Sequence, residues 1–310
     1  KDFAQLSSFG IANPYDVMFL HTGNLNVPEN IRTIIDTLFV KNAKKSLDEL
    51  NLRHRHYIKS EKYKGEIHFS TGSNTARSSS NFYALNNGIA TLFEIRGVGI
   101  GKTSFKRRIN SGLSVGFSFL KSAYENSNFI FDQIEIANNY SNDIVLEHQR
   151  SIYTDVIKAI DIGSNEIIDF ETTMHSSKDS YAISKRDRPL AYIIKQNNFG
   201  FIEKLKDVGI DYVEFQKDTV IYSGSYRVIE FNDNFKVYEK MKMQKVVTSI
   251  EYNDNGFSKG DILISMNQKR SNLIAELLEP EAPNSYVSFG IINTSLNSQL
   301  PIYRIKNLNN

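Results

Sequence analysis

The stretch FEIRGVGIGKTSFKRR, residues 93–108, places a glycine-rich turn between an apolar run and a helix-like segment. A nucleotide-binding P-loop has a similar outline, but its first glycine would fall at residue 96, which is Arg96. A side chain there obstructs the tight turn around a phosphate. No later segment provides the alternating strands and helices that carry an acidic Mg²⁺ ligand. The stretch therefore predicts a strand-to-helix connection, with Lys102 in solvent.

Glu94 lies in the strand before this turn, in a run otherwise built of Ile, Ala, Thr, Leu and Phe. A carboxylate in an apolar strand is costly to bury unless it is paired or functional. Because side chains alternate along a strand, Glu94 and Arg96 point to the same face. Two interpretations stay open. Residue physics alone favours a structural Glu94–Arg96 ion pair, and the alternative is a general base at the mouth of a cleft.

The composition bounds the class of protein. The chain has 310 residues, 40% hydrophobic and 23% charged, which is typical of globular proteins and sufficient for two domains. It has no cysteine, which excludes disulfides and thiolate sites. No apolar run approaches the ~18 residues of a membrane span. We find no nucleic-acid reader motif, so we expect neither a membrane span nor a nucleic-acid partner.

Charge is distributed unevenly along the chain. Residues 1–125 carry 17 basic and 10 acidic side chains, whereas residues 126–310 carry 20 and 25. The basic excess is concentrated between Arg53 and Arg108. A solvated basic face is the common cause of such an excess, and an anionic ligand is the alternative.

Residues 1–125 mix strands and helices. A strand is predicted over 15–23, a helix over 27–52, and short strands over 53–59 and 66–70. A second helix is predicted over 103–124, with apolar residues along one side: Phe105, Ile109, Leu113, Phe117, Leu120 and Tyr124. The pattern predicts an α/β layered domain, a partial mixed sheet with flanking helices. A sheet that lacks its early strands should also leave an apolar face exposed.

The pattern changes after residue 125. We expect a helical linker over 126–164 and a β-rich accessory domain over 165–310. Alternating apolar and polar residues in YRVIEF (226–231) and KVVTSIEY (245–252) indicate antiparallel strands with one solvated face. Short helices are expected over 199–207 and 271–279.

Several segments carry a family resemblance in chain order. They are NLNVPENIR (24–32), NFYALNNGIATLFEIRGVGIG (81–101), FKRRINSGLSVGFSFL (105–120), RPLAYIIK (188–195), SYRVIEF (225–231) and LLEPEAPNSYVSFGIIN (277–293). Together they resemble the zinc carboxypeptidases, in particular the end of the catalytic domain and the extra C-terminal domain of a larger bacterial branch. The resemblance covers most of the chain.

This resemblance implies a hydrolase of peptide substrates. In the family, one zinc is held by a His-x-x-Glu pair and a later histidine, and a glutamate takes a proton from the zinc-bound water. Arginines hold the C-terminal carboxylate of the peptide. Glu94 matches the catalytic glutamate of the family strand, and Arg96 beside it is the candidate substrate-binding residue.

The zinc ligands cannot be assigned, and the metal prediction for this chain is none. None of its histidines is followed by Glu three positions later. His21 ends a strand, but one histidine specifies a metal only loosely. His54 and His56 share a strand face and make half of a tetrahedral site, and their neighbours Arg53 and Arg55 repel cations. We therefore expect zinc in the family but no complete zinc site here.

Three functional interpretations follow. The first is the C-terminal part of a zinc metallocarboxypeptidase, inactive alone, whose metal-binding N-terminal half lies on another segment or chain. The second is a degenerate, non-catalytic relative that binds peptides or cell-wall fragments. The third is an anion-binding module that uses the basic region of residues 53–108. Family habit points to a periplasmic or exported protein, while side-chain specificity and oligomeric state stay open.

Overall fold

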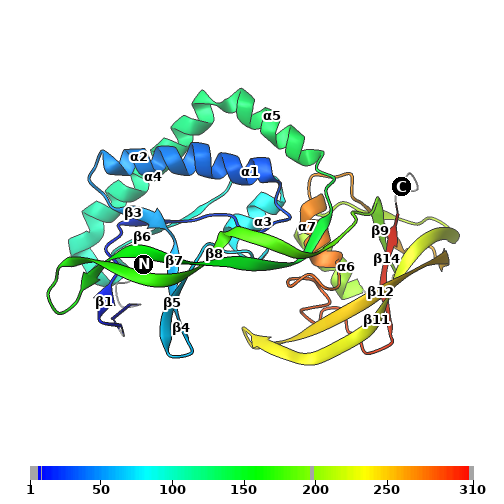
Figure 1. The fold of residues 1–310 in the computed structure, drawn as a ribbon. Coiled ribbons are helices and arrows are strands. Elements are labelled where there is room, and N and C mark those ends of the chain that lie inside the picture. Colours follow the sequence, from blue (N-terminus) through cyan, green and yellow to red (C-terminus); the bar gives the residue numbers. More distant parts are fainter. Residues whose placement is uncertain (1–5, 8, 196–198, 307–310) are drawn as a thin grey trace. The chain divides into compact units, whose positions relative to one another are not determined.

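The computed structural model describes residues 6–7, 9–195 and 199–306 (Figure 1). The chain forms two compact units. Unit 1 comprises Lys1–Ala137 and Gln149–Tyr181, and unit 2 comprises Asn138–His148 and Ala182–Asn310. These boundaries differ from a division at 125 and 165, because two long strands, over residues 144–161 and 167–186, each contribute residues to both units.

A three-stranded sheet lies in unit 1, in the order β3-β2-β6. The strands are β2 (Val17–Leu20), β3 (His54–His56) and β6 (Leu92–Ile95). Strand β2 pairs parallel with β3 and antiparallel with β6, and all four of its residues are buried. The strands predicted around residues 17–20, 54–56 and 92–95 are confirmed.

One continuous helical segment follows β2. It consists of α1 (Glu29–Ile34), the π-helical turn η2 (Ile35–Val40) and α2 (Lys41–Asp48). Its buried residues recur on one face, as an amphipathic helix requires: Ile31, Ile34, Ile35, Phe39, Val40, Ala43 and Leu47. The predicted helix over 27–52 is thus confirmed for residues 29–48. A shorter helix, α3 (Ser79–Leu85), precedes β6 along the chain.

The glycine-rich turn leads from β6 through the 3₁₀ segment η3 (Val98–Ser104) into α4 (Phe105–Glu125) and α5 (Ser127–Asn138). Gly97 has φ +118°, and a Cβ there would lie 2.7 Å from the Ser104 hydroxyl. That hydroxyl donates a hydrogen bond of 2.7 Å to the Gly97 carbonyl. Lys102 is exposed. The predicted strand-to-helix connection is confirmed.

A second sheet has the order β1-β7-β8-β5-β4. Its strands are β1 (Ile11–Ala12), β4 (Ile58–Tyr63), β5 (Glu66–Thr71), β7 (Ile144–Asp161) and β8 (Ile167–Arg186). The prediction of helix throughout 126–164 is wrong for residues 144–161, which form β7. The physical reason is that the buried residues repeat every two positions, as in a strand. Ile157 and Ala159 both enter the core, where they join Phe69 and Met174.

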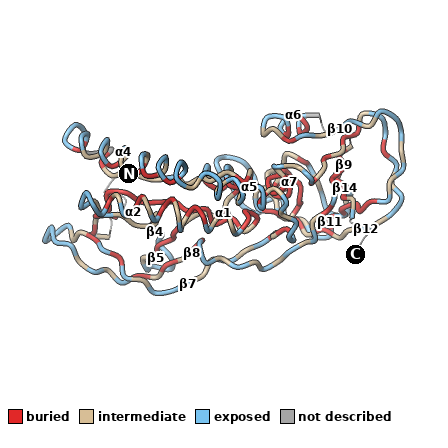
Figure 2. The backbone as a smooth tube through the Cα atoms, turned by 90° about the horizontal axis from the view of Figure 1, so that it is seen from above, coloured by how far each residue is buried: buried red, intermediate tan, exposed pale blue. Residues whose placement is uncertain are grey.

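Unit 2 is built on a six-stranded antiparallel sheet, in the order β10-β13-β9-β14-β11-β12. Its strands are β9 (Ala191–Ile194), β10 (Val213–Glu214), β11 (Thr219–Tyr238), β12 (Met241–Phe257), β13 (Ile262–Ser265) and β14 (Gln299–Ile305). Helices α6 (Phe199–Asp207) and α7 (Ser271–Leu278) complete it. Figure 2 shows α7 as a largely buried helix. The predicted β-rich, antiparallel C-terminal region is confirmed.

The whole chain is therefore of mixed α/β class with several sheets. Within the described ranges, none of the helices combines the length and apolar character that a membrane crossing requires.

Candidate functional site

The three-stranded sheet decides which chemical groups of unit 1 share a face. Phe19 of β2 is paired with His56 of β3 and with Phe93 of β6. Its neighbour Met18 is paired with Arg55 and Glu94. Directly paired residues point to the same face and successive residues to opposite faces. The register therefore puts His56 on one face of the sheet and Glu94 on the other.

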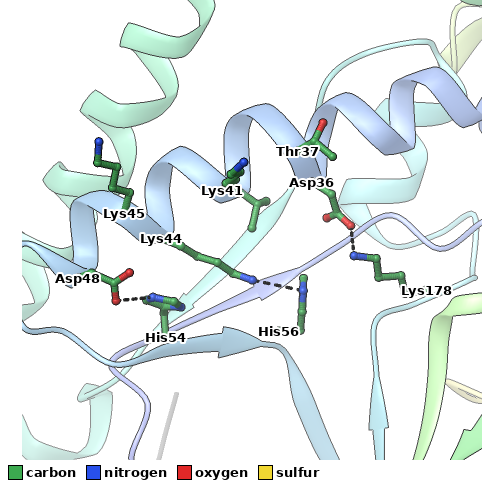
Figure 3. Close-up of a pocket in the computed structure, with 10 residues that line it drawn as sticks. Asp36, Thr37, Lys41, Lys44, Lys45, Asp48, His54, His56 and Lys178 are labelled. Atoms are coloured by element: carbon green, nitrogen blue, oxygen red, sulfur yellow. Dashed lines mark hydrogen bonds and ion pairs between the residues drawn. The ribbon is translucent and has the colours of Figure 1, made fainter.

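Two adjoining cavities border the histidine-bearing strand β3. The larger, of about 500 Å³, is lined by residues of η2, α2, β3 and β8: Asp36, Thr37, Val40, Lys41, Lys44, Lys45, Asp48, His54, His56 and Lys178 (Figure 3). The smaller, of about 310 Å³, shares Lys44, His54, His56 and Lys178 with it. The remainder of its lining is His21, Arg55, Thr71, Tyr153, Ser176 and Asp179.

Two histidines meet where these cavities join. The rings of His21 and His56 have centroids 5.3 Å apart and an interplanar angle of 88°. His21 is only 3% exposed. Within the described residues, neither ring nitrogen of His21 has a hydrogen-bond partner, and the same holds for Nδ1 of His56. Buried polar groups are normally paired, so these nitrogens are available to a bound molecule or water.

Lysines surround the two rings. Lys44 Nζ of α2 lies 3.4 Å from Nε2 of His56, and Figure 3 shows its side chain extending from the helix toward that ring. Lys178 Nζ of β8 lies 2.5 Å from a carboxylate oxygen of Asp36. The other carboxylate oxygen of Asp36 is buried without a partner in the described part of the chain.

The surroundings keep both imidazoles neutral. Burial lowers the pKa of His21 to about 4, with a smaller contribution from Lys178, against the raising effect of Asp36. Burial and the nearby Lys44 lower the pKa of His56 to about 3. Burial also lowers the pKa of Lys44. At neutral pH each ring thus offers one hydrogen-bond donor and one acceptor beside cationic lysines.

Glu94 occupies a different environment. It is half-buried on β6, and its charge adds to burial in raising the pKa of Tyr57. The linings of the two cavities include neither Glu94 nor Arg96. Sequence reasoning singled out Glu94 because a carboxylate is unusual in an apolar strand.

Arg96 is held by groups near the start of β2. Its guanidinium lies 3.9 Å from Asp16 Oδ1 and donates to the Pro14 carbonyl at 3.4 Å. Arg107 also approaches Asp16, at 3.6 Å. Burial, assisted by Arg107, lowers the pKa of Arg96 to about 10. The ion pair that the structure gives to Arg96 is therefore with Asp16, where the sequence had suggested Glu94.

The described residues do not fit a complete zinc site. No three of their His, Asp or Glu side chains gather closely enough to hold a metal ion. His21 and His56 supply two imidazoles. The Lys44 ammonium, however, lies beside His56 Nε2 and would repel a metal cation at that nitrogen. His54, the third nearby histidine, instead contacts Asp48 at 2.9 Å.

Sequence reasoning missed three residues of the site, namely Asp36, Lys44 and Lys178. Asp36 and Lys44 sit among helical residues whose apolar neighbours dominate the pattern, and a lysine in a helix is unremarkable. Lys178 comes from a strand more than a hundred residues away. Only the sheet and helix packing brings these charges to the histidines.

The chain is similar to several fungal proteins that share one name. The chain is 29% identical over 302 residues to carboxypeptidase 2 of Trichophyton equinum, which covers 94% of this chain and 55% of that protein. It is 27% identical to carboxypeptidase 2 of Trichophyton tonsurans and 28% to that of Trichophyton rubrum, with the same coverage. These relatives are fungal; the bacterial branch stays a prediction. The chain spans about half the length of the curated relatives it matches.

No family model matches the chain, and no solved structure matches it either. The similarity to the fungal proteins nevertheless extends along almost the whole chain, through both units. All three relatives carry the name carboxypeptidase 2, and the chain is similar to them along most of its length.

Proposed function

We propose that this chain contributes to a carboxypeptidase-like hydrolase that cleaves a peptide at its carboxyl end, with Glu94 as the general base. The observation that supports it is the similarity to carboxypeptidase 2 along 94% of the chain. Because those relatives are nearly twice as long, the activity is proposed for the protein of that length. The proposal includes a metal-binding half that lies on another segment or chain.

Glu94 has the chemistry that a general base requires. Its carboxylate is half-buried on the short strand β6 and, when ionised, can accept a proton. In the proposed step, one carboxylate oxygen accepts a proton from the attacking water and then returns it to the leaving amine. Glutamine cannot accept that proton, although it has nearly the same shape. Since the described residues do not fit a zinc site, we assign no step to a metal.

Arg96 is the proposed partner of the peptide carboxylate. Its side chain is 16% exposed and its charge is shared with Asp16, whose side chain is 6% exposed. A peptide carboxylate would therefore compete with Asp16 for the guanidinium. Arg107, at 39% exposure, is the more accessible cation of this group.

The test is Glu94→Gln in protein that has peptidase activity. We expect turnover to fall by ~10²–10⁴-fold while thermal unfolding is unchanged, because a general base contributes about this much. The matched control is Glu66→Gln, at an exposed position on β5, which should retain activity. If Glu94→Gln instead unfolds more easily and keeps turnover within a few-fold, Glu94 is a structural carboxylate.

The cavities favour a second candidate, an anion-binding module. Lys41, Lys44, Lys45 and Lys178 surround the larger cavity. In the basic region of residues 53–108, by contrast, Arg55 is paired with Asp155 and Arg96 with Asp16. If the chain binds anions, the lysine-lined cavity is the better site.

Phosphate titration separates the two candidates. The anion-binding candidate predicts that phosphate binding weakens in Lys44→Gln and with rising salt, whereas Lys240→Gln, an exposed lysine of unit 2, leaves it unchanged. If a protein of the relatives' full length binds peptides but does not hydrolyse them, the protein is instead a non-catalytic relative of the carboxypeptidases.

A further inference from the structure

Helix α4 packs with its polar side inward. Its buried residues are Ser111, Val115, Ser118 and Ser122. Helix α2 lies against this side, and the Asn42 amide donates a hydrogen bond of 2.9 Å to the Ser122 hydroxyl. Small serine side chains allow the two helices to approach closely. The packing inside unit 1 therefore does not use the apolar side of α4.

The large apolar side chains of α4 are exposed instead. Their exposed fractions range from 45% to 86%: Phe105, Ile109, Leu113, Phe117, Leu120 and Tyr124. On α5, Phe129 and Ile136 are more than half exposed and, seven residues apart, lie on the same side of the helix. We call these eight residues the α4–α5 face, and Figure 2 shows the exposed stretches of α4. A row of large exposed apolar side chains of this kind is typical of an interaction site.

The spacing of this face fits another helix. The six residues of α4 follow one another in steps of four, with one step of three. Such a row forms an i±4 ridge, and two i±4 ridges interdigitate at about −50°, the commonest crossing of packed helices. A surface with the same ridge is present on every copy of this chain.

The charges of the two helices complement each other. Helix α4 carries four basic side chains and one acidic, and three of the basic ones fall in its first turn. Arg107 approaches Asp16 inside unit 1, whereas Lys106 is exposed on the outer side. Helix α5 carries two acidic side chains, Asp132 and Glu135, and no basic one. Two copies related by a two-fold axis can place the basic start of each α4 toward the acidic α5 of the other.

We propose that the α4–α5 face is a homodimer interface, occupied by the same face of a second copy of this chain. An antiparallel arrangement also opposes the helix macrodipoles favourably. In an isologous interface each residue acts twice, so a favourable charge contact is doubled. An anionic membrane is a poorer occupant, because Asp132 and the neighbouring Glu135 would be repelled from it.

The experiment is sedimentation of the 310-residue chain across the micromolar concentration range. We expect the wild-type chain to dimerise and the double variant Phe117→Asp/Leu120→Asp to be monomeric, with the dissociation constant raised about tenfold or more, because two buried apolar anchors are lost from each copy. Both side chains are about two-thirds exposed in the single chain, so the fold should survive. Circular dichroism melts of dilute samples check this.

Val220→Asp on β11 is the matched control. Val220 is 67% exposed, compared with 66% for Phe117, and lies in unit 2. It should leave dimerisation unchanged. A charge exchange tests the arrangement: Lys106→Glu and Asp132→Lys should each weaken the dimer, and their combination should restore it.

Three results would overturn the proposal. The first is a wild-type chain that stays monomeric throughout the range, including one that binds vesicles of phosphatidylcholine and phosphatidylglycerol as a monomer. The second is a dimer that persists in Phe117→Asp/Leu120→Asp or is lost equally in Val220→Asp. The third is a charge-exchanged double variant that stays as weak as the single ones.

Discussion

The imidazoles of His21 and His56 meet edge to face, with ring centroids 5.3 Å apart, in the interior of unit 1. One ring follows β2 and the other lies on the parallel strand β3. Neither nitrogen of His21 is hydrogen-bonded to a described residue, and Lys44 is the near neighbour of His56. The pair therefore combines a buried ring, His21, with a half-buried ring, His56, and both are neutral at pH 7.

Acid should destabilise unit 1 through this pair. The folded-state pKa of His21, about 4, lies below the unfolded value of 6.5, so the unfolded chain takes up its proton first as the pH falls. Stability is then fully present above pH 6.5 and declines toward pH 4, by about 3 kcal/mol for His21 alone. His56 acts in the same direction. Urea unfolding between pH 7 and pH 4 measures this loss.

His21→Phe removes one titrating ring and should flatten that pH dependence. Met18→Leu serves as a control, since it alters the neighbouring core without changing any titrating group. An unchanged slope in His21→Phe would show that other groups cause the acid sensitivity.

Gly72→Ala should be costly because of His21. Gly72 has φ +75°, and a Cβ there would lie 2.5 Å from His21 Nε2. Gly10 has almost the same angle, φ +74°, with nothing within 4 Å of its Cβ position. Both substitutions incur backbone strain, but only Gly72→Ala also forces the ring to move. We expect it to lower the free energy of unfolding by about 1–3 kcal/mol more than Gly10→Ala does, as measured by chemical denaturation.

Glu279 is the centre of a buried network in unit 2. Its carboxylate accepts hydrogen bonds from the Tyr192 hydroxyl at 2.5 Å, from the Tyr226 hydroxyl at 3.0 Å and from Arg186 at 2.5 Å. Burial, reinforced by Glu279, raises the pKa of both tyrosines. The two tyrosine hydroxyls share this fully buried acceptor, whereas Arg186 also donates to Glu281, at 2.8 Å and 3.0 Å.

Glu279→Leu should therefore lower the free energy of unfolding by about 3–5 kcal/mol, because it leaves buried donors without their acceptor. Glu251→Leu removes an exposed ion pair with Arg227 and should cost less than about 1 kcal/mol. Thermal melts of both variants make the comparison. Equal small losses would mean that water or Glu281 replaces Glu279.

The contact between the serine side of α4 and helix α2 can be tested by substitution. Ser122 is 2% exposed against α2, whereas the next residue, Ala123, is exposed. Ser122→Leu should overpack this contact and cost about 1–3 kcal/mol. Ala123→Leu should stay within about 0.5 kcal/mol of wild type. Denaturation of dilute samples separates these effects from self-association, and equal stabilities would mean that α2 and α4 are not closely packed.

Local patterns predicted much of the secondary structure. The helices over 29–48 and 105–125 follow from the 3.6-residue period, and the strands of unit 2 follow from period-two alternation. The same reasoning was wrong for β7, because its apolar residues are too widely mixed with charged ones for the local pattern to distinguish a long strand from a helix. The core partners Phe69 and Met174 select the strand.

The candidate site was less accessible to sequence reasoning. Glu94 stood out as a carboxylate in an apolar run, and its role stays a prediction. The cluster around His21 and His56 could not be predicted, because Lys44 comes from a helix and Lys178 from a distant strand. The partner of Arg96, Asp16, is also eighty residues away in the sequence.

The sequence by itself determined the periodicities, the positions of the glycine turn and the family resemblance, since these depend on neighbouring residues along the chain. Only the tertiary structure decided which face each side chain occupies. Strand register placed His56 and Glu94 on opposite faces of one sheet. Helix packing turned the side of α4 with Ser111, Ser118 and Ser122 inward and the side with Phe105, Leu113 and Phe117 outward. A local apolar period gives the direction of a helix face but cannot identify the surface that will cover it, because that surface is formed by residues remote in the chain or by another molecule.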